Sequence, residues 1–346
     1  MKNNPPSRST DWTRREFLRT SIATAGSAAV VGGLPLQALA GIGEPEKPRV
    51  IKITSPRVLA EPSVTAAVDR KTVREMLEAG LTRLTGQKTL RDALGTLVGK
   101  DDVVGLKINC LGRQHLSTHA AIPELLAEAL QALGIPADAI YIFDRYQNHL
   151  KLAGYTLAEE PGHVQCVGFE RAMDPEATFT TADGSYTTNW PKLLTRRLTR
   201  IINLPVMKNH GGSGVTFALK NLAFGLVHPT KGPCHNNHCD PFIAEVCAEK
   251  RIQDRVVLHI LDGLVCGFDG GPAQCTRDKR AVHESLYFAL DPVAMDAVVR
   301  QELNAVRKQH DLREISLDHA RHIETAARRG LGTADRHKIA VVTAAI

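Results

Sequence analysis

Two cysteines and two histidines fall within six residues of this chain, in the run CHNNHC at positions 234–239. Thiolate and imidazole groups are the ligands that zinc, iron and copper prefer, and a loop allows such side chains to converge. Five of the seven cysteines lie between positions 234 and 275. This clustering predicts a metal centre, whose candidate ligands are Cys234, Cys239, Cys247, Cys266, Cys275, His235 and His238.

The same cysteines leave other interpretations open. The spacing matches no standard zinc finger, and the chain lacks the Cys-x2-Cys-x2-Cys run of an appended ferredoxin domain. Four converging thiolates would hold an iron–sulfur cluster, with zinc or another transition metal as the alternative. In an oxidising compartment, Cys234 with Cys239, or Cys266 with Cys275, could instead form short-loop disulfides. Cys247 lies in a stretch of helical pattern, where a buried thiol is common.

A glycine-rich turn carries the second set of candidate residues. Lys208 and His210 come at the end of an apolar strand, and Gly211 and Gly212 follow them directly. A glycine-rich turn that opens a helix offers backbone N–H groups and a positive dipole end, so it can bind an anion, and Lys220 in the expected helix adds charge. The pattern predicts a pocket for a carboxylate or phosphate. A tight turn with solvated lysines is the alternative.

Other polar residues near strand ends could face the same pocket. Lys107 and Asn109 alternate along one expected strand and therefore share a face. Asp262, at the end of another strand, could act as a general base or metal ligand, or it could cap the next turn. We expect Lys208, His210, Lys220 and Asp262 to be catalytic, and Lys107, Asn109, Gly211, Gly212 and Asn221 to bind substrate.

Apolar runs of strand length alternate with segments of helical period along the chain. This alternation predicts an α/β fold with a largely parallel central sheet and flanking helices, in which ligands collect at the carboxyl ends of the strands. Asp183-Gly184 predicts a small β-hairpin insertion over 180–189. The expected strands are 50–53, 102–109, 139–144, 164–168, 200–206, 256–262, 284–290 and 338–343, and the expected helices are 64–84, 122–133, 215–226, 242–249 and 293–303.

The first forty residues resemble a twin-arginine export signal. Arg14 and Arg15 precede a stretch of small apolar residues over 21–36, and Ala38-Leu39-Ala40 has the pattern of a cleavage site. We therefore expect a signal peptide over 1–40, a linker over 41–48 and a single α/β domain over 49–346, with the twin-arginine translocase as export partner and the periplasm as location. Because that route carries folded proteins, it favours a cofactor inserted before export.

The charge and hydropathy of the chain exclude some classes of protein. Of the formal net charge of +6 over 346 residues, half belongs to residues 1–40, where five basic residues face two acidic ones. About +3 is then left for the rest, which is too little to indicate a nucleic-acid partner. No apolar run reaches the ~20 residues of a membrane-spanning helix, so we expect no membrane span after cleavage.

Several of these motifs together resemble domain-of-unknown-function family 362 (DUF362). The resemblance covers roughly residues 103–303, and the family contains members with iron–sulfur domains and members with twin-arginine signals. The matching elements are Lys208-x-His210, the turn over 211–214, Leu219-Lys220-Asn221, a distal histidine at His228 or His235, Asp262-Gly263, Gly271-Pro272 and the run DPVAMD at 291–296.

The leading hypothesis is an exported redox protein with an iron–sulfur cluster or another thiolate-bound metal. It would act on a small anionic substrate or a redox partner, as a metal- or iron–sulfur-dependent oxidoreductase. One alternative is a metal-assisted hydrolase, lyase or isomerase that uses Asp262 or His210 as base. The other is a ligand-binding or maturation protein without turnover.

Overall fold

The computed structural model describes residues 47–227 and 232–346, and residues 47–346 form one compact unit. The expected signal peptide and most of the expected linker lie outside the described residues, as does His228. None of the helices in the described ranges is both long enough and apolar enough to cross a bilayer.

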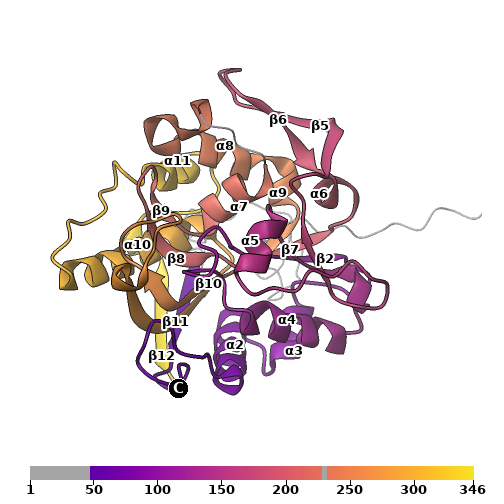
Figure 1. The fold of residues 1–346 in the computed structure, drawn as a ribbon, viewed down its shortest axis with the longest axis horizontal. Coiled ribbons are helices and arrows are strands. Elements are labelled where there is room, and N and C mark those ends of the chain that lie inside the picture. The colour runs from indigo at the N-terminus through magenta and orange to yellow at the C-terminus, as the bar shows by residue number, and fades with distance from the viewer. Residues whose placement is uncertain (1–46, 228–231) are drawn as a thin grey trace, which may run out of the picture. The chain divides into compact units, whose positions relative to one another are not determined.

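A ten-stranded sheet runs through the described unit (Figure 1). Its strands run parallel apart from β11 and β9, so the α/β fold with a largely parallel central sheet is confirmed. In sheet order, the strands are β12 (Ala340–Ala345), β1 (Arg49–Thr54), β11 (Arg280–Ala289), β10 (Val256–Gly267), β7 (Arg200–Asn203), β2 (Val104–Lys107), β3 (Ile140–Asp144) and β4 (Gln165–Gly168), while β8 (Val206–His210) pairs with β10 and β9 (Gly214–Thr216) pairs with β8.

Helices cover both faces of the sheet, because successive strand residues point to opposite sides. Ile201 of β7 packs in one hydrophobic cluster, and Ile202, the next residue, packs in the other. One group of helices consists of α2 (Arg70–Thr85), α3 (Leu90–Gly95) and α4 (Ala121–Ala132). A second group includes α7 (Ala218–Leu226), α8 (Phe242–Ala248), α10 (Pro292–Gln309) and α11 (His322–Arg328). In Figure 1 the two groups lie on opposite sides of the sheet.

The predicted β-hairpin insertion is also confirmed. Strands β5 (Met173–Thr180) and β6 (Thr187–Pro191) pair antiparallel outside the main sheet, and Gly184 in their connection has a φ of 71°. Trp190 is fully buried and meets the ring of Phe179 edge-on, with 5.8 Å between centroids. This contact joins the two strands of the hairpin, and Phe179 also meets the ring of Phe242 in α8 edge-on, with 6.1 Å between centroids, which attaches the hairpin to the hydrophobic core.

Several expected boundaries were wrong, and β10 and α10 continue to Gly267 and Gln309, well beyond the expected 262 and 303. The first long helix begins at Arg70 rather than near residue 64, because the side chain of Asp69 accepts a hydrogen bond from the Thr72 backbone at 2.7 Å and caps it. The expected strand over 200–206 divides into β7 and β8 at Leu204-Pro205, where proline supplies no N–H to the ladder. Residues 214–216 form strand β9, so the glycine-rich turn leads into a strand, and α7 begins only at Ala218.

Shorter elements complete the described unit. The remaining helical elements are α5 (Gln147–Leu152), α6 (Lys192–Arg196) and α9 (Lys250–Gln253), with 3-10 turns at Ala137–Ala139, Pro233–Cys239, Arg277–Lys279 and Arg336–Lys338.

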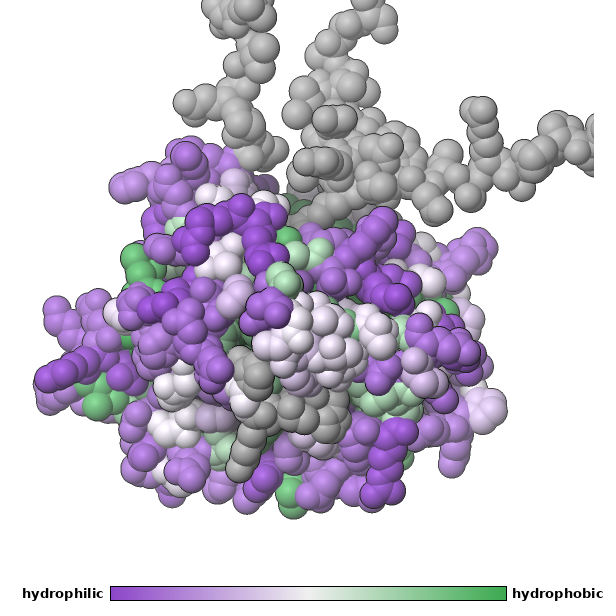
Figure 2. Space-filling model, turned by 90° about the horizontal axis from the view of Figure 1, so that it is seen from above, coloured by the Kyte–Doolittle hydropathy of each residue, from purple (hydrophilic) through white to green (hydrophobic). Residues whose placement is uncertain are grey.

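On the face seen in Figure 2, hydrophilic side chains predominate and hydrophobic ones occur in small separate groups.

Candidate functional site

Polar residues end three neighbouring parallel strands. Lys107 is the last residue of β2, Asp144 the last of β3 and Asn203 the last of β7, and Lys107 lies directly beside Asn203 in the sheet register. All three side chains are buried. The carboxyl edge of β3, β2 and β7 therefore holds a buried polar group, at the position where parallel sheets usually bind ligands.

Lys107 is fully occupied by protein partners. Its Nζ donates to Asp144 Oδ1 at 2.8 Å, to the Ile108 carbonyl at 2.6 Å and to Asn221 Oδ1 at 3.4 Å. The other oxygen of Asp144 accepts the Cys110 backbone N–H at 2.6 Å. Because an ammonium group has three N–H donors, this geometry gives Lys107 a structural role between β2, β3 and α7.

Asn221 is the centre of the network. Its Oδ1 accepts from Asn109 Nδ2 at 2.9 Å as well as from Lys107, and its Nδ2 donates to Asn203 Oδ1 at 2.8 Å and to the Lys107 carbonyl at 3.3 Å. Asn203 Nδ2 in turn lies 3.0 Å from His259 Nδ1. Asn221 thus uses both donors and both acceptor positions inside the protein. We infer that it positions the site rather than contacting a ligand.

Lys208 has a different environment. Its side chain is fully buried, and among the described residues Asn109 Oδ1, at 2.8 Å, is its one hydrogen-bond acceptor. No ion pair within the described ranges includes it. Burial lowers the pKa of Lys208 to about 8, against the smaller opposing effects of Cys275 and Asp144. Two of its N–H groups are left for another partner.

Lys220 is buried in a similar way on α7. Its Nζ donates to Ser213 Oγ at 2.8 Å and lies 4.7 Å from the centre of the Phe224 ring. The described part of the chain supplies no carboxylate within ion-pair distance. Burial lowers the pKa of Lys220 to about 7, with Cys239 opposing the shift and Lys208 adding to it. Both lysines therefore change protonation near neutral pH, which suits proton transfer as well as anion binding.

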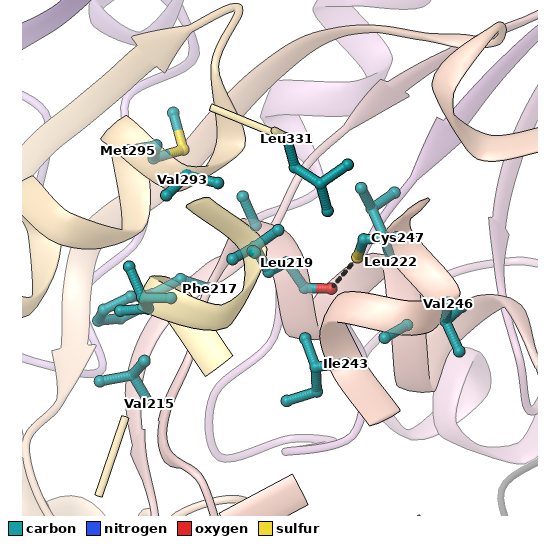
Figure 3. Packing of buried hydrophobic residues seen from close by; sticks show 14 of the residues in the cluster. Val215, Phe217, Leu219, Leu222, Ile243, Val246, Cys247, Val293, Met295 and Leu331 are labelled. Carbon is teal, nitrogen blue, oxygen red and sulfur yellow. Dashed lines mark hydrogen bonds between the residues drawn. The ribbon is translucent and has the colours of Figure 1, made fainter. Parts of the chain in front are cut away.

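Helix α7 is held in place at its N-terminus by Asp296. The buried carboxyl group accepts the backbone N–H of Ala218 at 2.8 Å and of Leu219 at 3.1 Å. Burial raises the pKa of Asp296 to about 8. Figure 3 shows the apolar side of the same helix, where Leu219 and Leu222 pack near residues of α8 and α10. Asp296 is the last residue of the DPVAMD run, and its structural function is to fix the helix that carries Lys220 and Asn221.

The glycine-rich turn does not offer the amide groups expected for an anion. The backbone N–H of Gly212 and of Ser213 donates to His210 Nδ1, at 2.9 and 3.1 Å. His238 Nδ1 and His319 Nε2 lie 3.0 and 2.9 Å from the carbonyls of Gly212 and Gly211. Asp296 also occupies the first amides of α7, so these amides of the turn and of the helix start are engaged within the protein. Any anion at this site must rely on side chains.

His210 is neutral in this arrangement. Burial, and then the charge of Lys220, lower the pKa of His210 far below its ordinary value. Because Nδ1 accepts the two amide bonds, the ring proton resides on Nε2. The side chain therefore stabilises the turn through one nitrogen and carries an N–H on the other.

The candidate cysteines lie at different places in the fold. All seven remain thiols, so neither alternative disulfide is formed. Cys234 and Cys239 lie within electrostatic range of Lys220. Cys275 and Lys208 both pack against Gly267. A Cβ atom added at Gly267 would come 2.7 Å from the Cys275 sulfur and 3.1 Å from Lys208 Cβ.

The two remaining candidate cysteines are also buried in the protein. Cys247 donates to the Leu219 carbonyl at 3.2 Å, among apolar side chains (Figure 3). Burial raises the pKa of Cys266 to about 12. Within the described ranges, no group of three or more His, Cys, Asp or Glu side chains is arranged to hold a metal ion. The thiols therefore do not fit a four-thiolate cluster, and we derive no chemical step through one.

Asp262 forms a dyad with His119, a histidine that no sequence motif singled out. Its Oδ2 accepts both the backbone N–H of His119 and the ring Nδ1, each at 2.8 Å, and its Oδ1 accepts the Leu264 amide at 3.1 Å. Burial opposes protonation of His119, but the Asp262 carboxylate outweighs it and raises the pKa of His119. The partners lie 143 residues apart, so no local motif could have revealed the pair.

Comparisons with known proteins support a family assignment. The profile of "Domain of unknown function (DUF362)" matches residues 104–301, and no protein of curated function matches the chain. One solved structure, a structural-genomics protein from Thermotoga maritima, shares 10% identity with a TM-score of 0.38. The match covers 78% of this chain and only 60% of that one, and a likeness this weak carries no functional argument.

Proposed function

We propose that this chain, which belongs to the DUF362 family, binds a small oxyanion at Lys208 and Lys220. The matched residues 104–301 include both lysines and the polar residues that contact Lys107 and Asn221. One observation carries the proposal: two buried ammonium groups lie within electrostatic range of one another, and neither has a carboxylate partner among the described residues. A carboxylate or phosphate group would supply the missing negative charge.

The energetics favour such a ligand. An unpaired buried charge costs several kcal/mol, and the protein avoids that cost either by losing the proton or by gaining an anion. Lys107 shows the contrasting case, since Asp144 pairs with it at 2.8 Å. Lys208 and Lys220 each keep two N–H donors beyond their one protein acceptor. Charge-assisted hydrogen bonds from those donors to an oxyanion are among the stronger polar interactions in proteins.

Acid–base catalysis by Lys220 is a second candidate function. Burial lowers its pKa to about 7, close to the value at which a general base works best at neutral pH. A lyase or isomerase that takes a proton from a bound carboxylate or phosphate compound would use this property. The lysine would accept the proton at Nζ while Lys208 holds the anionic group.

Isothermal titration calorimetry with inorganic phosphate and with acetate tests oxyanion binding. We expect Lys208→Met and Lys220→Met each to weaken binding at least about tenfold, because a charge-assisted hydrogen bond contributes about 1.5–3 kcal/mol and 1.4 kcal/mol is a factor of ten. The exposed Lys88 provides the matched control, Lys88→Met. If the wild-type protein binds neither anion, or if the three variants bind alike, the proposal fails.

Binding should also take up protons. The pKa values of about 8 and about 7 mean that Lys208 and Lys220 are partly neutral in the unliganded protein at pH 8, whereas a bound anion favours their charged forms. We expect affinity to fall as the pH rises through 7 to 9. In titrations at pH 8, the observed binding enthalpy should differ between buffers of different ionisation enthalpy, because binding takes up protons from the buffer. The same binding enthalpy in every buffer would contradict this linkage.

Export and redox activity remain proposals from the sequence. We expect the mature protein in the periplasmic fraction, and replacement of Arg14 and Arg15 by lysine should retain the precursor in the cytoplasm. The iron–sulfur prediction is tested by iron and sulfide analysis of protein purified anaerobically from the periplasm. Its support is the cysteine clustering along the sequence and the export signal, whereas the described thiols are not arranged as a four-thiolate site.

A further inference from the structure

His322 is a buried histidine whose two ring nitrogens both lack a hydrogen-bond partner in the described part of the chain. It is the first residue of α11 and has no solvent exposure. Burial, and then the charge of Lys220, lower its pKa to about 3, so the ring is neutral. A buried polar group without a protein partner requires an explanation, and a bound group or ion is one of the known ones.

Other buried histidines of this protein do have partners. His259 lies 3.0 Å from the Asn203 side chain, and His210 accepts two backbone amides. The lack of partners at His322 is therefore not a general feature of the buried imidazoles described here. It occurs within electrostatic range of Lys220, whose ammonium also has unused donors, and of His210. His319, three residues before His322, lies with its Nε2 2.9 Å from the carbonyl of Gly211, the residue after His210.

We propose that His322 is a third ligand-binding group, which donates a ring N–H to the oxyanion held by Lys220 and Lys208, and that this ligand is a phosphate group rather than a carboxylate. This inference rests on the proposed oxyanion site. No protein partner in the described ranges fixes the tautomer of His322, so either ring nitrogen can carry the donating proton.

The number and origin of the donors favour phosphate. Lys208 lies on β8, Lys220 on α7 and His322 on α11, so the donors approach from three different elements. Together they offer up to five N–H groups, two from each lysine and one from the neutral ring. A planar carboxylate presents two oxygens from one side. A tetrahedral phosphate presents three or four oxygens in divergent directions and carries up to two negative charges, which matches two ammonium groups and a neutral donor.

The test compares inorganic phosphate with acetate by calorimetry on the wild type and on His322→Leu. We expect the wild type to bind phosphate more tightly than acetate. His322→Leu should weaken phosphate binding about tenfold, which corresponds to about 1.4 kcal/mol, and should change acetate binding less. The exposed His163 provides a control, His163→Leu, which should leave both affinities unchanged.

Stability separates a ligand contact from a structural role. Because its ring nitrogens have no partner to lose, His322→Leu should keep or raise the melting temperature, whereas His259→Leu, which removes a partnered imidazole, should lower it. If His322→Leu does not fold, His322→Gln is used for the affinities, and phosphate-induced shifts of the His322 ring signals are measured by 15N NMR on the wild type.

Failure of this inference is distinguishable from failure of the oxyanion site. If the wild type binds acetate but not phosphate, or if His322→Leu binds phosphate as the wild type does, His322 is not a phosphate ligand and the lysine site stands. Absence of ring-signal shifts on phosphate binding leads to the same conclusion. If neither anion binds to the wild type, both proposals are overturned.

Discussion

Replacing Lys220 by methionine should make the unliganded protein more stable at neutral pH, although it removes two favourable contacts. Lysine in the unfolded chain has a pKa of 10.5, and burial lowers it to about 7 in the folded protein. Between these values the unfolded state binds a proton that the folded state does not, so the free energy of unfolding rises with pH across this window. Below pH 7, by contrast, the full cost of the buried charge remains.

The size of this cost follows from the pKa difference. The shift from 10.5 to about 7 corresponds to about 5 kcal/mol at pH 7 and below, at about 1.4 kcal/mol per unit. Methionine is unbranched and apolar and should fill the same space. It loses the hydrogen bond to Ser213 and the contact with the Phe224 ring, together about 2 kcal/mol. A net gain of about 3 kcal/mol is therefore expected at pH 6–7.

Urea unfolding at pH 6, 7, 8, 9 and 10, followed by circular dichroism, measures this effect. The wild type should gain stability between pH 7 and 10, with Lys208 contributing above pH 8 because its pKa is lowered to about 8. Lys220→Met should start from a higher value and show a smaller slope, while Lys88→Met should follow the wild type. A Lys220→Met protein that is less stable at pH 6 and keeps the full wild-type slope would refute the reasoning.

Three further substitutions test the scaffold around the lysines, each by urea unfolding. Asn221→Leu should destabilise the protein by about 3 kcal/mol or more, because it leaves several buried polar groups without partners; a loss below 1 kcal/mol would contradict a central role. Asp296→Ala should cost about 1–2 kcal/mol through loss of the α7 cap, and it should also weaken phosphate binding because Lys220 loses its position; unchanged binding would separate the cap from the site. Gly225→Ala should cost about 1–3 kcal/mol, because its Cβ would come 2.6 Å from Lys107 Nζ, whereas Gly99→Ala, whose Cβ would meet its nearest atom at 3.7 Å, should be nearly neutral.

Much of the fold was predictable because the signals are local. Alternating apolar runs and helical periods indicated the parallel α/β sheet, and Asp183-Gly184 indicated the hairpin. The errors arose where a single residue overrode the period. Pro205 divides a continuous apolar run, and the cap at Asp69 delays a helix whose apolar pattern begins earlier.

The candidate site was predictable in residue type but not in role. Lys208 and Lys220 were selected from a local motif and are the two lysines of the network with unused donors. Lys107, Asn109 and Asn221 were selected as substrate contacts, and the structure engages them with one another instead. A strand-end position predicts nearness to a ligand site, but hydrogen-bond saturation depends on which other chain segments arrive there.

The sequence alone determined which strands end in polar groups and which residues carry charge, because both depend on composition and period within about ten positions. Tertiary structure decided which residues pair: Asp144 with Lys107, Asp262 with His119, and Asp296 with the start of α7. It left His322 without a partner in the described ranges. It also gave the clustered cysteines different surroundings, with Cys234 and Cys239 near Lys220 and Cys275 near Lys208. Burial then set the protonation of Lys208 and Lys220, since the cost of a buried charge depends on all the atoms packed around it and not on the neighbouring residues in the sequence.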